Sequence, residues 1–96
     1  MRPSEALATR RHDLLRLTAA RGAANLRVFG SVARGTDEPG SDIDLLVQLP
    51  SGTSLLKVVG LQQEIEDLLG VPVDLCTERE LHPLLKDRIL SEARQL

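Results

Sequence analysis

The chain carries Val28-Phe29-Gly30-Ser31 and, after ten further residues, Asp42-Ile43-Asp44. The apolar run before Gly30 predicts a short strand, and the run from Ile43 to Leu49 predicts a second, buried strand. Side chains two apart on a strand project to the same face, so Asp42 and Asp44 can converge on one point. This stretch therefore predicts two strands joined by a turn-rich segment, with a pair of carboxylates on one face.

The rest of the chain alternates between helical and strand-like patterns. We expect a helix over residues 4–21 with Ser4 as its cap, a single helical turn over 31–34 and a helix over 55–69. A last helix is expected to begin at a capping box at Thr77. The expected strands are 26–29, 43–49 and 71–76. In the last helix Leu81, Leu85, Ile89 and Ala93 face one way, and Pro83 either sits in the first turns or splits it. The order α-β-α-β-α-β-α predicts one α/β domain over residues 1–96, with a small sheet covered by helices.

Size and charge restrict the partners. A chain of 96 residues buries only somewhat more than about 60% of the surface that its unfolded form exposes, so association with a partner or an oligomer would help it. Its only aromatic residue is Phe29, so the core must be aliphatic. The net charge of -2 gives no general attraction to a polynucleotide backbone, and we expect no long nucleic acid as partner.

The single cysteine, Cys76, excludes an intrachain disulfide and suits a reducing compartment. The first twenty residues mix Arg with Glu5 and Asp13 and hold no continuous apolar stretch, so neither a signal peptide nor a membrane span is expected. A cytoplasmic location without membrane association is the expectation that follows.

A third carboxylate, Asp74, lies in the separate apolar run 71–75. Carboxylate oxygens are the ligands of a hard ion such as Mg²⁺, and three acids are enough to hold two ions when phosphate oxygens complete the shells. Gly30 lets the backbone approach a phosphate closely, and Ser31 offers a hydroxyl and an N–H. Together these residues predict a metal site that handles a nucleoside triphosphate, with Asp74 as ligand and as base for an acceptor hydroxyl.

Each of these residues also has a plainer interpretation. Asp42 and Asp44 could belong to a solvated turn, Asp74 could cap or flank the following helix, and Ser31 could be an N-cap. Arg34 is either a phosphate contact or a salt-bridge partner of the acidic turn 36–40, and the sequence favours neither.

Three further residues could carry chemistry. No second Cys or His stands at zinc-ligand spacing, so His12, His82 and Cys76 are interpreted as structural or surface residues.

The segments Val28–Gly35 and Ser41–Val47 resemble the signature of the DNA polymerase beta-like nucleotidyltransferase superfamily. In size the chain is similar to its minimal nucleotidyltransferases, the MNT proteins, and Val73-Asp74-Leu75 looks like their third-acid strand. The resemblance implies a mixed sheet of three to four strands flanked by helices.

For the site, the resemblance implies Mg²⁺ held by Asp42, Asp44 and Asp74, and triphosphate contacts from Gly30 and Ser31. It also implies a partner, because many MNT proteins are antitoxins of a helical HEPN ribonuclease toxin and transfer AMP from ATP onto a tyrosine of that toxin. We therefore expect an adenylyltransferase antitoxin. Two alternatives are an antitoxin that neutralises its toxin by binding alone and an orphan nucleotidyltransferase that acts on a small molecule.

Overall fold

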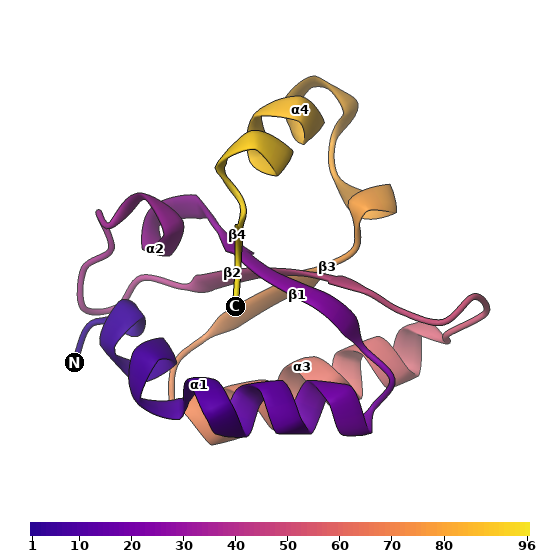
Figure 1. The fold of residues 1–96 in the computed structure, drawn as a ribbon, viewed down its shortest axis with the longest axis horizontal. Coiled ribbons are helices and arrows are strands. Elements are labelled where there is room, and N and C mark those ends of the chain that lie inside the picture. Colours follow the sequence, from indigo (N-terminus) through magenta and orange to yellow (C-terminus); the bar gives the residue numbers. More distant parts are fainter.

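A computed structural model describes all of residues 1–96, and its centre is a four-stranded sheet in the order β3-β2-β1-β4 (Figure 1). The elements are α1 (Pro3–Ala20), β1 (Ala24–Phe29), α2 (Gly30–Arg34), β2 (Ile43–Gln48), α3 (Leu55–Leu69), β3 (Val73–Cys76), the 3-10 helix η1 (Glu78–Glu80), α4 (Pro83–Glu92) and β4 (Arg94–Gln95). Strand β1 runs antiparallel to β2 and to β4, whereas β2 and β3 are parallel. The predicted α/β class and the mixed sheet are confirmed.

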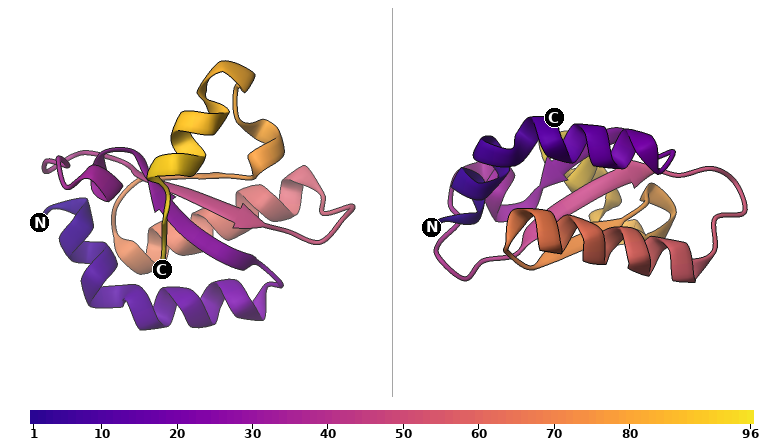
Figure 2. Two further views of the ribbon diagram at one scale, coloured as in Figure 1. Left: turned by 45° about the horizontal axis from the view of Figure 1, so that its top comes forward. Right: turned by 90° about the horizontal axis from the view of Figure 1, so that it is seen from below.

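The main core lies between one face of the sheet and the helices α1 and α3. Ile43, Leu45 and Val47 alternate along β2 and are fully buried there, as the period of a strand requires. From the helices, Leu14 and Ile65 reach into the same layer with no exposed surface. Figure 2 shows α1 and α3 side by side against this face. The predicted aliphatic core is confirmed, since Phe29 is buried but stands outside this cluster.

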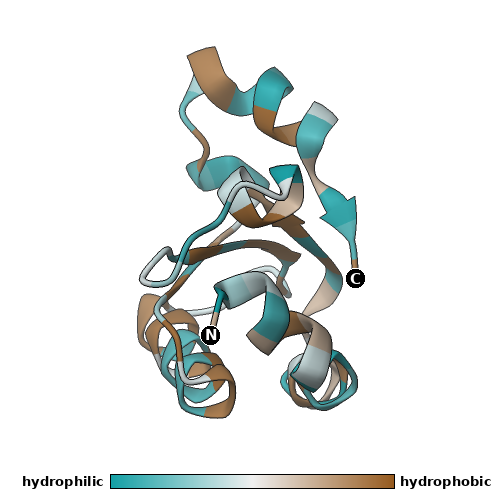
Figure 3. Ribbon diagram, turned by 90° about the vertical axis from the view of Figure 1, so that its left-hand side faces the viewer, coloured by the Kyte–Doolittle hydropathy of each residue, from teal (hydrophilic) through white to brown (hydrophobic).

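The opposite face of the sheet carries Asp44, Leu46 and Asp74, of which Leu46 is buried, Asp44 half-buried and Asp74 exposed. Helix α4 stands above it, apart from the layer of α1 and α3 (Figure 3). No residue of α4 is buried, and Leu84 is 87% exposed. No helix of the chain combines the length and the apolar character that a bilayer crossing needs. The sheet thus has one packed face and one partly open face, and the acids lie on the open one.

Ser4 is not the cap of the first helix. Helix α1 begins at Pro3, which tolerates the first helical position because it has no N–H to satisfy. The N–H of Ser4 instead donates to Oδ2 of Asp37 at 2.8 Å, and Arg2 pairs with Oδ1 of Asp37 at 3.0 Å. A carboxylate from the loop between α2 and β2 therefore stabilises the start of α1.

The last predicted helix is interrupted. The capping box of Thr77 and Glu80 forms as expected, but it serves only η1, and α4 begins anew at Pro83. His82 caps α4 through Nδ1, which accepts from the N–H of Leu84 at 3.1 Å. The expected common face of this helix buries none of its residues. The short strand β4, which pairs with β1, was not predicted.

Candidate active site

Two of the three predicted acids meet across neighbouring strands. Asp44 on β2 and Asp74 on the parallel strand β3 are direct register partners, so their side chains leave the sheet on the same face. Asp42 precedes β2 by one residue and is exposed, whereas Asp44 is half-buried. The backbone thus brings Asp44 and Asp74 together, with Asp42 two residues before Asp44.

The charges of these acids influence one another. Burial raises the pKa of Asp44 above its usual range, and the nearby Asp74 and Asp42 raise it further. None of the five ion pairs of the protein includes any of the three. The nearby Arg34 lowers the pKa of Asp44, but by less than burial and the two neighbouring carboxylates raise it, and a bound cation would relieve their repulsion.

No three acidic, histidine or cysteine side chains stand close enough to form a ready-made ion-binding group in the metal-free chain. The donor set suits a hard cation even so, because carboxylate oxygens project from two adjacent strands on one face. Their side chains would have to turn toward a common point as an ion binds.

Gly30 packs directly against this group. Its φ is +72°, and a Cβ at this position would collide with Oδ2 of Asp44 and lie 3.1 Å from Cγ of Asp44. Any side chain here would push Asp44 out of place. The backbone at Gly30 therefore lies close to a carboxylate of the protein itself, and its predicted approach to a phosphate stays a prediction.

Several alternatives from the sequence can now be decided. Ser31 lies within α2, whose N-cap is Phe29, so Ser31 is not an N-cap. Asp74 lies inside β3, and Thr77 caps the following helical turn, so Asp74 is not a cap. Asp44 belongs to a strand and not to a solvated turn.

Arg34 forms a salt bridge, but not with the acidic turn. Its Nη1 lies 3.2 Å from both carboxylate oxygens of Glu92, at the end of α4. The same Glu92 accepts a hydrogen bond from the N–H of Gly30 at 3.0 Å. The Gly30 N–H and the Arg34 guanidinium lower the pKa of Glu92 despite its partial burial. No sequence signal could have identified Glu92, because 62 residues separate it from Gly30.

Cys76 shares the open face of the sheet without taking part in its chemistry. Its Sγ lies 3.5 Å from the carbonyl oxygen of Leu45. Burial and then the charge of Asp74 raise the pKa of this thiol to about 12, so it is protonated and a poor nucleophile near neutral pH. The structural interpretation of Cys76 is therefore supported.

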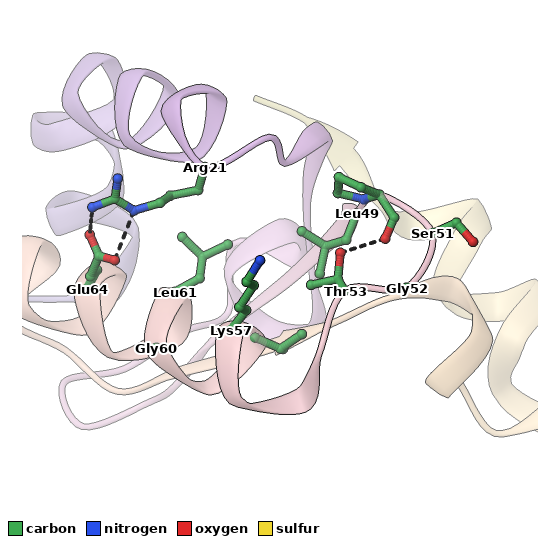
Figure 4. Close-up of a pocket in the computed structure, with 11 residues that line it drawn as sticks. Arg21, Leu49, Ser51, Gly52, Thr53, Lys57, Gly60, Leu61 and Glu64 are labelled. Atoms are coloured by element: carbon green, nitrogen blue, oxygen red, sulfur yellow. Dashed lines mark hydrogen bonds and ion pairs between the residues drawn. The ribbon is translucent and has the colours of Figure 1, made fainter.

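The largest concavities lie away from the acids. One, of about 520 Å³, is formed by the end of α1, the loop after β2 and the first turns of α3, where Arg21 pairs with Glu64 (Figure 4). A second, of about 640 Å³, borders the same loop and η1. Neither is lined by Gly30, Ser31 or the three aspartates, so the candidate site is an open surface and not an enclosed pocket.

Comparisons with known proteins point to one family. Residues 14–96 match the family described as "Nucleotidyltransferase domain". The chain is 50% identical over 72 residues to a protein of Methanocaldococcus jannaschii named "putative protein adenylyltransferase". The aligned residues cover 75% of this chain and 77% of that protein.

Solved structures agree on the fold. One described as a "putative minimal nucleotidyltransferase" superimposes with a TM-score of 0.84 at 47% identity, covering 97% of this chain and 95% of that one. A second belongs to a complex of a tri-AMPylated HEPN toxin of Shewanella oneidensis with an MNT antitoxin. It has a TM-score of 0.70 at 19% identity and covers 92% of this chain and 69% of that one, which establishes a common fold.

Proposed function

Because this chain belongs to the nucleotidyltransferase domain family, and is a nucleotidyltransferase, we propose that it transfers AMP from ATP to a hydroxyl group of a partner protein. The observation that carries the proposal is the pairing of Asp44 with Asp74 across β2 and β3, with Gly30 packed against Asp44. The relative named as a protein adenylyltransferase supports a protein as acceptor.

In this proposal Asp42, Asp44 and Asp74 hold Mg²⁺, as two ions when triphosphate oxygens complete the shells. Burial and then the charges of Asp74 and Asp42 raise the pKa of Asp44, and this cost of the ionised carboxylate supports a cation at this place. Bound Mg²⁺ would supply charge neutralisation for the triphosphate and would lower the pKa of the acceptor hydroxyl.

The remaining residues bind and orient the nucleotide. The Gly30 N–H, the Ser31 hydroxyl and the Arg34 guanidinium contact the triphosphate. The acceptor oxygen forms a bond to the α-phosphorus, the bond to the β-phosphate oxygen breaks, and pyrophosphate leaves. Asp74 accepts the proton of the acceptor hydroxyl. ATP is thus the substrate and AMP is the group transferred.

We propose a HEPN-type toxin as the partner and a tyrosine as the acceptor, with this chain as its antitoxin. The common fold with an MNT antitoxin bound to a tri-AMPylated HEPN toxin supports this assignment, as does the resemblance of residues 28–47 to the MNT signature. The open face of the sheet leaves room for an acceptor supplied by a second protein.

The test is co-expression of this chain with the product of the neighbouring gene, followed by mass spectrometry of that product. We expect the partner to gain AMP with the wild-type chain and to gain none with the double variant Asp42→Asn/Asp44→Asn. The matched control is Asp13→Asn/Asp67→Asn, which removes two carboxylates from α1 and α3 on the other side of the sheet.

Undiminished labelling by the variant without Asp42 and Asp44 would overturn the proposed mechanism. Neutralisation of the toxin by that variant without labelling would favour the alternative function, in which the chain acts by binding alone. Absence of a helical partner from the gene neighbourhood would favour a transferase that acts on a small molecule.

A further inference from the structure

Glu92 brings a carboxylate from the far end of the chain to the nucleotide site. One of its oxygens accepts from the Gly30 N–H at 3.0 Å, and both lie 3.2 Å from Nη1 of Arg34. A carboxylate and a phosphate both present anionic oxygens to N–H donors. Glu92 is therefore bound to the Gly30 N–H and the Arg34 guanidinium, which are two of the three groups proposed to bind the triphosphate.

We propose that Glu92 is a built-in competitor of the nucleotide, whose carboxylate must leave Gly30 and Arg34, together with the end of α4, before ATP can bind fully. This inference rests on the proposed function, because it concerns the same donors. It adds a regulatory contact that holds the free protein in a form with low affinity for ATP.

The contact persists in the free protein because it is charge-assisted on both sides. The Glu92 side chain is only 20% exposed, so water competes weakly for it, whereas Arg34 is 46% exposed. The pairing of β4 with β1, and a hydrogen bond from the Leu96 N–H to the Leu26 carbonyl at 3.1 Å, hold the end of the chain in place.

The segment that carries Glu92 is nevertheless weakly attached to the rest of the protein. No residue of α4 is buried, Leu84 is 87% and Leu85 48% exposed, and β4 is only two residues long. Elements with few buried apolar groups open at a small fraction of the global unfolding free energy. Segment 83–95 can therefore move while the core between the sheet, α1 and α3 stays folded.

Electrostatics also favour the departure of Glu92 when a nucleotide arrives. Glu92 is among the negative groups that raise the pKa of Asp44, so it adds to the charge that a triphosphate would meet. Both anions cannot bind the same N–H. Displacement removes one negative charge from the site and frees Arg34 for a phosphate.

The first test measures binding of ATP in the presence of Mg²⁺ by calorimetry. In Glu92→Gln the amide oxygen can still accept the hydrogen bond from the Gly30 N–H, so this contact remains. Because the amide is neutral, a phosphate displaces it more easily than it displaces a carboxylate. We expect roughly three- to tenfold tighter binding, the size of one partly exposed charge-assisted contact. The matched control is Glu64→Gln, which removes the same charge from the ion pair with Arg21 and should bind like the wild type.

A second variant separates displacement from simple repulsion. Glu92→Asp keeps the charge but shortens the side chain by one methylene and weakens the contact with both donors. Displacement predicts that it, too, binds ATP more tightly than the wild type, with a lower KM for ATP and an unchanged kcat in AMP transfer. If Glu92→Asp bound ATP with wild-type affinity, the tighter binding of Glu92→Gln would reflect only the loss of a negative charge near the site, and the proposal would be overturned.

Hydrogen exchange of the wild-type protein supplies a readout independent of activity. Adding ATP and Mg²⁺ should speed amide exchange in segment 83–95, because Glu92 leaves its donors. Slower or unchanged exchange there would overturn the proposal. Failure of the proposed function can be told apart from failure of this inference. If the proposed function is wrong, neither the wild type nor any variant transfers AMP. If only this inference is wrong, the wild type still transfers AMP but Glu92→Gln binds ATP no more tightly than the wild type.

Discussion

At position 30 a side chain is excluded twice, once by the backbone and once by a neighbour. A φ of +72° is costly for any residue with a Cβ, and that Cβ would collide with Oδ2 of Asp44. We predict that Gly30→Ala lowers the free energy of unfolding by about 2 kcal/mol or more and reduces AMP transfer at least about tenfold. Chemical denaturation and the labelling assay measure the two effects.

Gly70 provides the matched control, because it has the same φ of +72° and no atom within 4 Å of its would-be Cβ. Gly70→Ala should cost about 1 kcal/mol of stability and leave AMP transfer unchanged. Equal loss of transfer in both variants would show that backbone strain, and not the position of Asp44, explains the effect.

Asp44 should destabilise the metal-free protein at neutral pH. Its folded pKa is raised by burial and by Asp74 and Asp42, so the carboxyl favours the folded state below its ordinary value of 3.8 and loses that effect as the pH rises through the folded pKa. We predict that Asp44→Asn raises the free energy of unfolding by a few tenths to about 1 kcal/mol at pH 7 without Mg²⁺. Urea titrations at pH 7 and pH 3 check this, and a gain that does not shrink at pH 3 would contradict it.

At the scale of the element, α1 depends on a carboxylate that lies outside it. Hydrogen bonds from Ser4 and Arg2 lower the pKa of Asp37, so its contribution to stability is complete above the ordinary value of 3.8 and is lost as the pH falls toward the lower folded pKa. We predict that Asp37→Ala lowers the Tm by several degrees at pH 7, and that the loss becomes smaller as the pH falls below the ordinary carboxyl pKa of 3.8. Glu38→Ala, one residue away and exposed, should leave the Tm nearly unchanged.

Helices α3 and α4 should respond very differently to the same substitution. Leu61 on α3 is 4% exposed within the core, so Leu61→Ala should cost about 2–5 kcal/mol. Leu84 on α4 is 87% exposed, so Leu84→Ala should change stability by no more than about 0.5 kcal/mol. Thermal melts of the two variants test this contrast, and a large cost at Leu84 would mean that α4 is buried in solution.

The elements that the sequence predicted well are those that local patterns determine. The apolar run 43–49 predicted a buried strand and the helical spacing of 55–69 predicted a helix with one buried face, and both elements appear within one residue of the expected bounds. Contacts between distant segments have no such local signal. The cap from Asp37 to Ser4 spans 33 residues and the bond from Gly30 to Glu92 spans 62, so neither could be read from spacing.

The candidate site divides in the same way. The alternation of β2 predicted that Asp44 would oppose Ile43, and the parallel register then placed Asp74 beside it. The partner of Arg34 depended on where α4 ends, which no pattern determines because α4 buries no face. Pro83 allowed two outcomes, and the structure shows the second, in which η1 ends at Glu80 and α4 begins at Pro83.

At the scale of the whole molecule, the two faces of the sheet have different tasks. One face is packed by α1 and α3 and supplies the stability, and the terminal segment with α4 lies on the opposite side of the sheet (Figures 1 and 3). That opposite face carries Asp44 and Asp74. The fold tolerates the repulsion between these acids because the packing of the other face by α1 and α3 stabilises the sheet. Ligand binding should therefore be visible as a gain in stability of the entire protein.

We predict that ATP with Mg²⁺ raises the Tm, since a ligand that binds only the folded state at 100 times its Kd stabilises it by about 2.7 kcal/mol. For a domain of this size that corresponds to about 10 °C or more. ATP with EDTA should give little shift, and Asp42→Asn/Asp44→Asn should give none with either. At the same ATP concentration the rise in Tm should be larger in Glu92→Gln than in the wild type, because displacing the neutral side chain from Gly30 and Arg34 costs less free energy. A metal-independent shift of equal size would contradict the assignment of the aspartates as the metal ligands.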